Sequence, residues 1–373
     1  MPPTIAELPD LIAALPERER TIAERLFQVE VSEGTIEPPE AMESWIERTF
    51  GSVAAARKQR IVRVMNRWTF EGATFNPLRA QRPGAGTTAT GPAADPPELV
   101  ERIARAEGDD FCQPETRTPA DSFGRVRGEH TITAANVAKA DGWHGVVVFE
   151  RHDPLALDEA LVRDMLGAAL EWAERARAED AAARHFFLLW NCLWKAGASL
   201  IHGHAQMTLS HEMAHARVEQ LRAASARYRA ETGGDYIADY AATLEALGLR
   251  VFTTAQGVSA YASLTPVKER EVILLAPGAH TEEAQGRMAA PLWAVLRAAM
   301  EKMGVRAFNV AVYGPPIGPD DARAGWEGFP LVARFVDRGA PLAATSDIAA
   351  LELFGSSVIA ADPFAVVATL REA

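Results

Sequence analysis

The sequence predicts an α+β protein made of two similar halves behind a helical N-terminal extension. In the first 70 residues apolar side chains recur at helical spacing. From about residue 140 onward, short β-branched or aromatic runs alternate with long amphipathic segments, a pattern of strands and helices. The order of those segments then occurs a second time, which indicates an internal duplication. The 373 residues, 48% of them hydrophobic, suffice for a full core.

The N-terminal extension comprises residues 1–70. Two stretches, "PERERTIAERLFQVEV" and "SVAAARKQRIVRVMNRWTF", show apolar residues at helical spacing and predict helices. A loop rich in Gly, Pro, Thr and Ala follows from Arg82, "RPGAGTTATGPAADPPE". It is longer than a simple connection, and loops of that length are mostly functional or disordered.

The duplication covers residues 71–210 and 251–373. In the first unit a strand ends near His152, and a helix over 157–179, a strand over 185–191 and a strand containing "IHGHAQM" follow. In the second a strand ends near His280, and a helix over 282–304 and strands over 307–316 and 329–337 follow. Residues 211–250 are predicted to be linking helices. Val332 and Arg334 are expected at the places of the two histidines, so only the first unit is predicted to be catalytic.

Composition excludes several classes of function. A net charge of −12 argues against broad binding to nucleic acid, which requires neutralising phosphates. No apolar run is long enough to span a membrane, and the N-terminus lacks the features of a signal peptide. Two cysteines, Cys112 and Cys192, make no disulfide framework. A cytoplasmic enzyme is expected.

The stretch "GASLIHGHAQM" carries the chemistry. Side chains alternate along a strand, so His202, His204 and Gln206 project to one side. A neutral imidazole with one nitrogen free and its N–H held attacks phosphorus, and a nearby glutamine donates to phosphate oxygens. Upstream, Asn191, Gly197 and Ser199 supply further donors to an anion. The pattern favours nucleotidyl transfer through a covalent phosphohistidine over two structural histidines.

The segment "NCLWKAGASLIHGHAQ" resembles the active-site segment of the galactose-1-phosphate uridylyltransferase-like family. This is the transferase branch of the histidine-triad superfamily, which also holds dinucleoside-polyphosphate and ADP-glucose phosphorylases. The resemblance implies duplicated histidine-triad-like units, with an antiparallel sheet flanked by helices, and a homodimer. It implies that His204 is the nucleophile and that Asn191, Ser199 and Gln206 contact the phosphates. The implied reaction moves a nucleoside monophosphate from a nucleotide sugar or dinucleotide to a phosphate or sugar 1-phosphate acceptor.

Three further segments extend the resemblance over most of residues 70–370. "FNPLRAQRP" implies substrate contacts for Arg79 and Arg82, "TAANVAKADG" a nucleoside contact for Asn136, and "ALELFGSSVIAADP" a substrate contact for Glu352. The base and the sugar are not readable. Gly203 stands where hexose uridylyltransferases often have Pro, which favours the phosphorylase-like relatives.

The resemblance also implies a structural zinc. Many relatives hold zinc with Cys-x-x-Cys, a later His and the first His of His-x-His. Here "DDFC" places Asp109 and Cys112 at the first pair, and His152 and His202 match the histidines. Zinc accepts Asp oxygen, so this set is chemically sound. The alternative is a loop held by hydrogen bonds without metal. A second row of polar residues is predicted to be solvated or weakly structural: His211, His215 and Glu219.

Alternatives to a transferase remain at this stage. A phosphorylase or hydrolase of the same superfamily would use the same histidine. A metallohydrolase would use His202 and His204 as paired ligands, although no convincing further ligands follow on later strands. A third alternative is a nucleotide-binding protein without catalysis.

Overall fold

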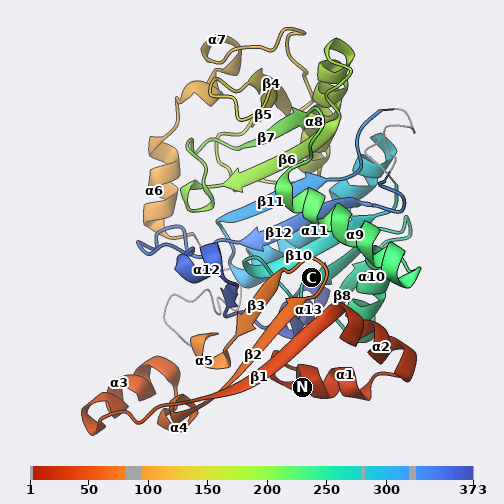
Figure 1. The fold of residues 1–373 in the computed structure, drawn as a ribbon. Helices are drawn as coiled ribbons and strands as arrows, with labels where there is room; N and C mark the ends of the chain where they lie inside the picture. Colours follow the sequence, from red (N-terminus) through yellow and green to blue (C-terminus); the bar gives the residue numbers. More distant parts are fainter. Residues whose placement is uncertain (1–2, 81–94, 279–281, 319–324, 373) are drawn as a thin grey trace.

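Two β-sheets organise the chain (Figure 1). The structure is a computed structural model that describes residues 3–80, 95–278, 282–318 and 325–372. The larger, antiparallel sheet has the strand order β4 (Thr131–Ala135), β5 (Trp143–Phe149), β7 (His204–Ser210), β6 (His185–Cys192), β11 (Phe308–Tyr313), β12 (Leu331–Asp337), β10 (Glu269–Ala276), β9 (Ser259–Ala262) and β8 (Arg250–Thr253). The smaller sheet has the order β1 (Phe27–Thr35), β2 (Lys58–Asn66), β3 (Gly72–Phe75) and β13 (Ser357–Ile359). In it β13 runs parallel to β3.

Helices cover both faces of the larger sheet. On one face α8 (Glu159–Glu179) and α11 (Glu282–Met303) pack against each other. The indole of Trp172 in α8 presses on Gly145 of β5, where a Cβ atom would lie 2.7 Å from it. On the other face α9 (Ala216–Thr232) begins after His215, whose ring lies 4.6 Å from that of Phe187 in β6. Beside α11, α13 (Pro363–Arg371) packs against β8, β9 and β10. The remaining helices are α1 (Leu8–Ala14), α2 (Glu17–Leu26), α3 (Glu40–Phe50), α4 (Val53–Arg57), α5 (Pro77–Ala80), α6 (Pro97–Arg105), α7 (Pro114–Arg117), α10 (Tyr236–Ala246) and α12 (Ala350–Phe354).

The strand order repeats, as a duplicated α+β fold requires. The succession β5–α8–β6–β7 has the spatial order β5-β7-β6, and β10–α11–β11–β12 has the order β10-β12-β11. The two units meet where β6 pairs with β11, so one continuous sheet runs through both. Among the described residues, no helix is both long and apolar enough to cross a lipid bilayer.

The pairing register links the two units through one cross-strand row. Gln206 pairs with Leu189, Leu189 with Ala311, and Ala311 with Arg334. This row crosses the junction of the units at Leu189 and Ala311, so Arg334 and Gln206 lie in the same row. The correspondence of Val332 and Arg334 with the two histidines stays a prediction, because strand pairing alone does not fix which residues of two repeats are equivalent.

The N-terminal region is not wholly helical, which corrects an expectation drawn from the sequence. Residues 27–35 and 58–66 are the strands β1 and β2, paired over their full length. Val62, Val64 and Asn66 are buried on alternate positions, a period of two that β-branched residues favour. The helical spacing in "SVAAARKQRIVRVMNRWTF" ends with α4. The ribbon β1–β2 carries α3 and α4 away from the body, at the lower left of Figure 1.

Candidate active site

The His-x-His segment enters β7 through a close backbone approach at Gly203. The Phe149 N–H donates to the Gly203 carbonyl (2.9 Å), and the Gly203 N–H donates to the His152 carbonyl (3.1 Å). A Cβ atom on Gly203 would lie 2.7 Å from the Phe149 ring. A glycine is therefore required between the two histidines, and it lets them reach two different environments.

His204 has the arrangement of a nucleophile. Its Nδ1 lies 2.7 Å from the His202 carbonyl oxygen, and because a carbonyl only accepts, Nδ1 carries the proton. The Nε2 lone pair is then free. The side chain is 4% exposed, and burial lowers the pKa of His204, so the imidazole is neutral at neutral pH. The Phe111 ring packs edge-on against it at 5.0 Å.

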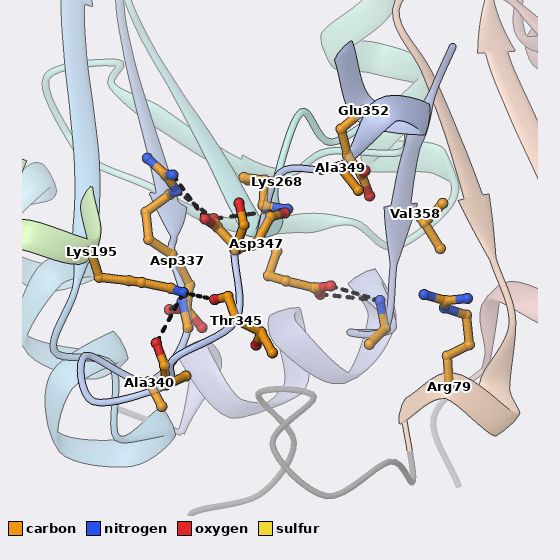
Figure 2. Close-up of a pocket in the computed structure, with 16 residues that line it drawn as sticks. Arg79, Lys195, Lys268, Asp337, Ala340, Thr345, Asp347, Ala349, Glu352 and Val358 are labelled. Carbon is orange, nitrogen blue, oxygen red and sulfur yellow. Dashed lines mark hydrogen bonds and ion pairs between the residues drawn. The ribbon is translucent and has the colours of Figure 1, made fainter. Parts of the chain in front are cut away.

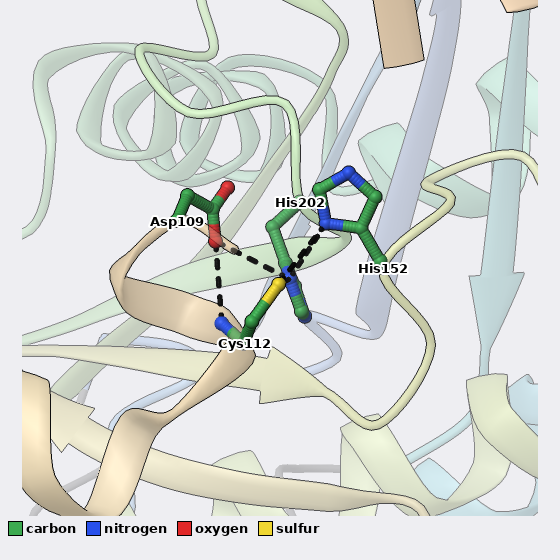
Figure 3. A group of neighbouring side chains, drawn as sticks. All are labelled: Asp109, Cys112, His152 and His202. Atoms are coloured by element: carbon green, nitrogen blue, oxygen red, sulfur yellow. Dashed lines mark hydrogen bonds and ion pairs between the residues drawn. The ribbon is translucent and has the colours of Figure 1, made fainter. Parts of the chain in front are cut away.

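The four predicted metal ligands converge on one point (Figure 3). Cys112 Sγ lies 3.3 Å from His152 Nδ1 and 3.4 Å from His202 Nδ1, and these two nitrogens are 3.2 Å apart. Asp109 Oδ1 lies 3.5 Å from His202 Nδ1. Tetrahedral zinc with ordinary bond lengths separates its ligands by about 3.3 Å for two nitrogens and about 3.5 Å for sulfur and nitrogen. The observed distances between the ligand atoms match these separations.

The protonation pattern of the cluster also fits a cation. His152 Nε2 and His202 Nε2 donate to the carbonyls of Ile103 (3.0 Å) and Phe149 (2.8 Å). Both Nδ1 lone pairs consequently face each other, an arrangement that a bound metal ion would relieve. Asp109 Oδ2 is buried without a hydrogen-bond partner. The cluster therefore offers the donor atoms of a zinc site, with lone pairs available on Cys112, Asp109 and the two imidazoles.

Gln206 contacts a histidine that the sequence pattern did not single out. Gln206 Oε1 lies 2.9 Å from His144 Nε2, and the Asn136 side chain lies 3.2 Å from the same nitrogen. The structure thus brings the predicted nucleoside contact Asn136 next to Gln206. His144 lies near the start of an apolar strand, two residues before Val146, so both side chains point to the same face of the sheet. This alternation was the signal in the sequence that could have identified His144.

The loop between β6 and β7 is strained and anchored to the second unit. Leu193 has φ 67° and ψ 164°, a region that is costly for any residue except glycine, and Gly197 has φ 99°. The Trp194 indole N–H donates to the Pro341 carbonyl (2.9 Å). Ser199 is exposed at the end of this loop. Strain held by surrounding structure is common in loops that serve a functional site.

Asn191 belongs to a polar chain that reaches into the second unit. Its Oδ1 accepts from Asn309 Nδ2 (2.7 Å), and Asn309 Oδ1 accepts from Arg338 (2.7 Å). Arg338 forms a two-pronged ion pair with Asp347 at 2.6 and 3.0 Å. The sequence did not nominate Asn309 or Arg338, because nothing along the chain indicates that β11 pairs with β6.

Two of the predicted substrate contacts meet in one pocket (Figure 2). Arg79 and Glu352 both line a cavity of about 430 Å³ between the first helical turn after β3 and the C-terminal part of the chain. Lys195, within the strained loop, lines it as well and donates to the Thr345 carbonyl. Arg82, the partner predicted for Arg79, lies outside the described residues.

A second pocket opens beside the metal-ligand cluster. Its volume is about 570 Å³, and Phe111, Cys112 and Phe149 contribute to its wall. Since Phe111 also contacts His204, this pocket and His204 share a neighbouring side chain.

The second polar row, His211, His215 and Glu219, forms no cluster of metal ligands among the described residues. His211 pairs with Asp180 at 2.5 Å, and Glu219 pairs with Arg222. His215 contacts Thr208. In the described part of the chain, the cluster around Cys112 is the one group with metal-ligand geometry.

Comparison with known proteins rests on structure, because no protein-family model matches the sequence and no curated protein matches it significantly. An ADP-glucose phosphorylase from Arabidopsis thaliana, solved with bound ADP-glucose, has TM-score 0.61 and 15% identity over 83% of this chain and 98% of that one. A GalT-like protein from Arabidopsis thaliana has TM-score 0.58 and 14% identity over 71% and 92%. A uridylyltransferase has TM-score 0.54 and 18% identity over 68% and 88%. The chain therefore has the fold that the ADP-glucose phosphorylase, the GalT-like protein and the uridylyltransferase share.

Proposed function

We propose that this protein is a nucleotidyltransferase of the uridylyl- or adenylyltransferase/phosphorylase type. It moves a nucleoside monophosphate from a nucleotide sugar or a dinucleotide to phosphate or a sugar 1-phosphate. The observation that carries the proposal is the environment of His204, a buried neutral imidazole with Nδ1–H held by a backbone carbonyl and Nε2 free. That is the protonation state in which a histidine attacks phosphorus.

The reaction proceeds by double displacement. His204 Nε2 forms a bond to the α-phosphorus, and the bond from phosphorus to the leaving oxygen breaks with its electron pair on that oxygen. The positive charge on the substituted imidazole lies against the His202 carbonyl through Nδ1–H. The acceptor oxygen then attacks the same phosphorus and releases His204. Asn191, Gly197, Ser199 and Gln206 are proposed to bind the phosphates, which lowers the barrier by positioning and charge stabilisation.

We also propose that Asp109, Cys112, His152 and His202 hold a structural zinc ion. Zinc would lock the orientation of His202, whose carbonyl in turn orients His204. The arrangement disfavours a metallohydrolase with paired histidine ligands, because His202 Nδ1 faces the cluster of metal ligands and His204 does not belong to that cluster.

The ADP-glucose phosphorylase neighbour suggests the donors to try first. Incubation with ADP-, UDP- and GDP-sugars, followed by intact-protein and peptide mass measurement, is expected to reveal one nucleoside monophosphate on His204. The variant His204→Gly is expected to lose both the adduct and turnover. His211→Ala, a change at an exposed histidine, is the matched control and is expected to keep both. Full turnover by His204→Gly would rule the mechanism out.

A further inference from the structure

His144 and Gln206 meet across two paired strands. Val146 of β5 lies opposite Gln206 of β7, and His144 lies opposite Thr208, so His144 and Gln206 are diagonal neighbours. Diagonal positions on one face are within reach of long side chains. The two side chains use that reach, with Nε2 of His144 2.9 Å from Oε1 of Gln206.

The tautomer of His144 follows from its surroundings. The backbone N–H of Ala140 points at His144 Nδ1 at 2.9 Å. A backbone N–H only donates, so Nδ1 is the unprotonated nitrogen and the proton of the neutral ring is on Nε2. Nε2–H therefore donates to Gln206 Oε1.

The turn that contains Ala140 also hydrogen-bonds to the backbone carbonyl of His144. The Asn136 N–H donates to the His144 carbonyl at 2.9 Å, and Lys139 Nζ donates to the same oxygen at 3.3 Å. His144 is buried, with 5% of its surface exposed. The position of the Ala140 N–H, and with it the tautomer, is therefore built into the fold.

Asn136 removes the alternative acceptor for the His144 proton. Its Oδ1 accepts from the Ala138 N–H at 3.1 Å, so the Asn136 group that lies 3.2 Å from His144 Nε2 is the NH2 group, which cannot accept the proton. The carbonyl oxygen of Gln206 is thus the acceptor left for Nε2–H. A reversed Gln206 amide would leave Nε2–H between two NH2 groups with no acceptor, so the Gln206 NH2 group is held away from His144.

We propose that His144 is a positioning residue that keeps Gln206 oriented as a hydrogen-bond donor toward the phosphoryl group. This inference rests on the proposed nucleotidyl transfer. As the bond to the leaving oxygen breaks, negative charge grows on the phosphate and leaving-group oxygens, and the Gln206 NH2 group stabilises it. The Gln206 carbonyl oxygen in the same place would repel that charge. His144 neither gives nor takes a proton in the reaction.

The test compares three histidine variants by single-turnover transfer from a nucleotide sugar to His204. His144→Phe keeps a ring but removes the donor, and His144→Gln returns an N–H near the place of Nε2. His185→Phe is the matched ring exchange on β6, beside Trp326 and away from Gln206. Loss of one stabilising donor costs about 100-fold or more in rate. Since the Gln206 amide still samples the productive orientation, we expect His144→Phe to be about 10-fold slower.

The other expected results follow from action through Gln206. His144→Phe should leave donor affinity nearly unchanged, His144→Gln should recover most of the rate, and His185→Phe should match the wild type. In a Gln206→Ala background, His144→Phe should cause no further loss. A wild-type rate for His144→Phe, or an equal further loss in Gln206→Ala, overturns the proposal.

A separate measurement does not depend on turnover. Long-range 1H–15N spectra of the imidazoles should show the His144 proton on Nε2, and a proton on Nδ1 would overturn the proposal. If the wild type forms no adduct on His204, the proposed function fails, while these spectra still decide whether His144 orients Gln206.

Discussion

At the scale of single residues, the two histidines of the His-x-His pair do different work because a glycine separates them. Gly203 lets the chain pass between Phe149 and the segment that carries His152. His202 then faces the metal-ligand cluster, and His204 begins β7 with Nε2 free. The backbone carbonyl of His202 joins the two roles, since it fixes the tautomer of His204.

Gly203→Ala is expected to lower the free energy of unfolding by about 1–3 kcal/mol, the usual cost of overpacking. The added methyl group would meet the Phe149 ring at 2.7 Å and the Arg151 carbonyl at 3.3 Å, so the strand that carries His204 must shift. Urea unfolding measures the effect. The matched control is Gly167→Ala in α8, where a Cβ atom meets nothing within 4 Å and helix propensity predicts a gain of about 0.5–1 kcal/mol. Unchanged stability of Gly203→Ala would contradict the close approach.

At the scale of elements, the metal-ligand cluster joins the turn after α6 to the adjacent ends of the paired strands β5 and β7. Asp109 and Cys112 come from the 3-10 turn after α6, His152 from the turn after β5, and His202 from the residue pair before β7. The His152 imidazole also contacts the carbonyl of Ile103 in α6. A cation bound here would fasten α6 and its turn to β7, the strand that carries His204.

Zinc removal is therefore expected to lower Tm. Free zinc at about 1,000 times its Kd would add about 4 kcal/mol to the free energy of unfolding, and a chelator would withdraw it. Thermal unfolding with and without chelator, together with metal analysis, measures this. Cys112→Ala should lose both the one zinc ion bound per protein and the change in Tm on chelation. Cys192→Ala, which changes the other cysteine, should retain both. An identical shift in Cys112→Ala would exclude this cluster as the zinc site.

At the scale of the whole molecule, a buried ion cluster holds the smaller sheet against the second unit. Arg334 of β12 contacts Glu271 of β10 at 2.6 Å and Glu71, just before β3, at 2.8 Å. Burial raises the pKa of Glu271, and the neighbouring guanidinium opposes that rise. The cross-strand row that carries Gln206 in the first unit thus carries a buried cation in the second unit.

Arg334→Leu is expected to lower the free energy of unfolding by about 3–5 kcal/mol, because it leaves the buried Glu271 carboxylate without its cationic partner. Chemical denaturation at neutral pH measures the loss. Arg63→Leu, at an exposed ion pair with Glu30, is the control and should cost less than about 1 kcal/mol. Equal effects of the two substitutions would show that the buried cluster contributes no more than a surface pair.

Short-range patterns were sufficient for much of this protein. The alternation of strands and helices, the duplicated order and the His-x-His-x-Gln face depend on side-chain periodicity over a few residues, which is written along the chain. The proximity of Asp109, Cys112, His152 and His202 was implied by resemblance, and the structure brings the four together. The same local logic failed at Lys58–Asn66, where basic and apolar residues fit both periods and pairing with β1 selected the strand.

The sequence by itself determined the α+β class, the repeated units and the nucleophile that we propose. Tertiary structure alone decided that Arg334 lies in the cross-strand row of Gln206, that Asn191 connects to Asn309, and that His144 contacts Gln206. The physical reason is that strand register, the tautomer of a ring and the orientation of an amide depend on partners distant in the sequence. Local periodicity carries no information about those partners.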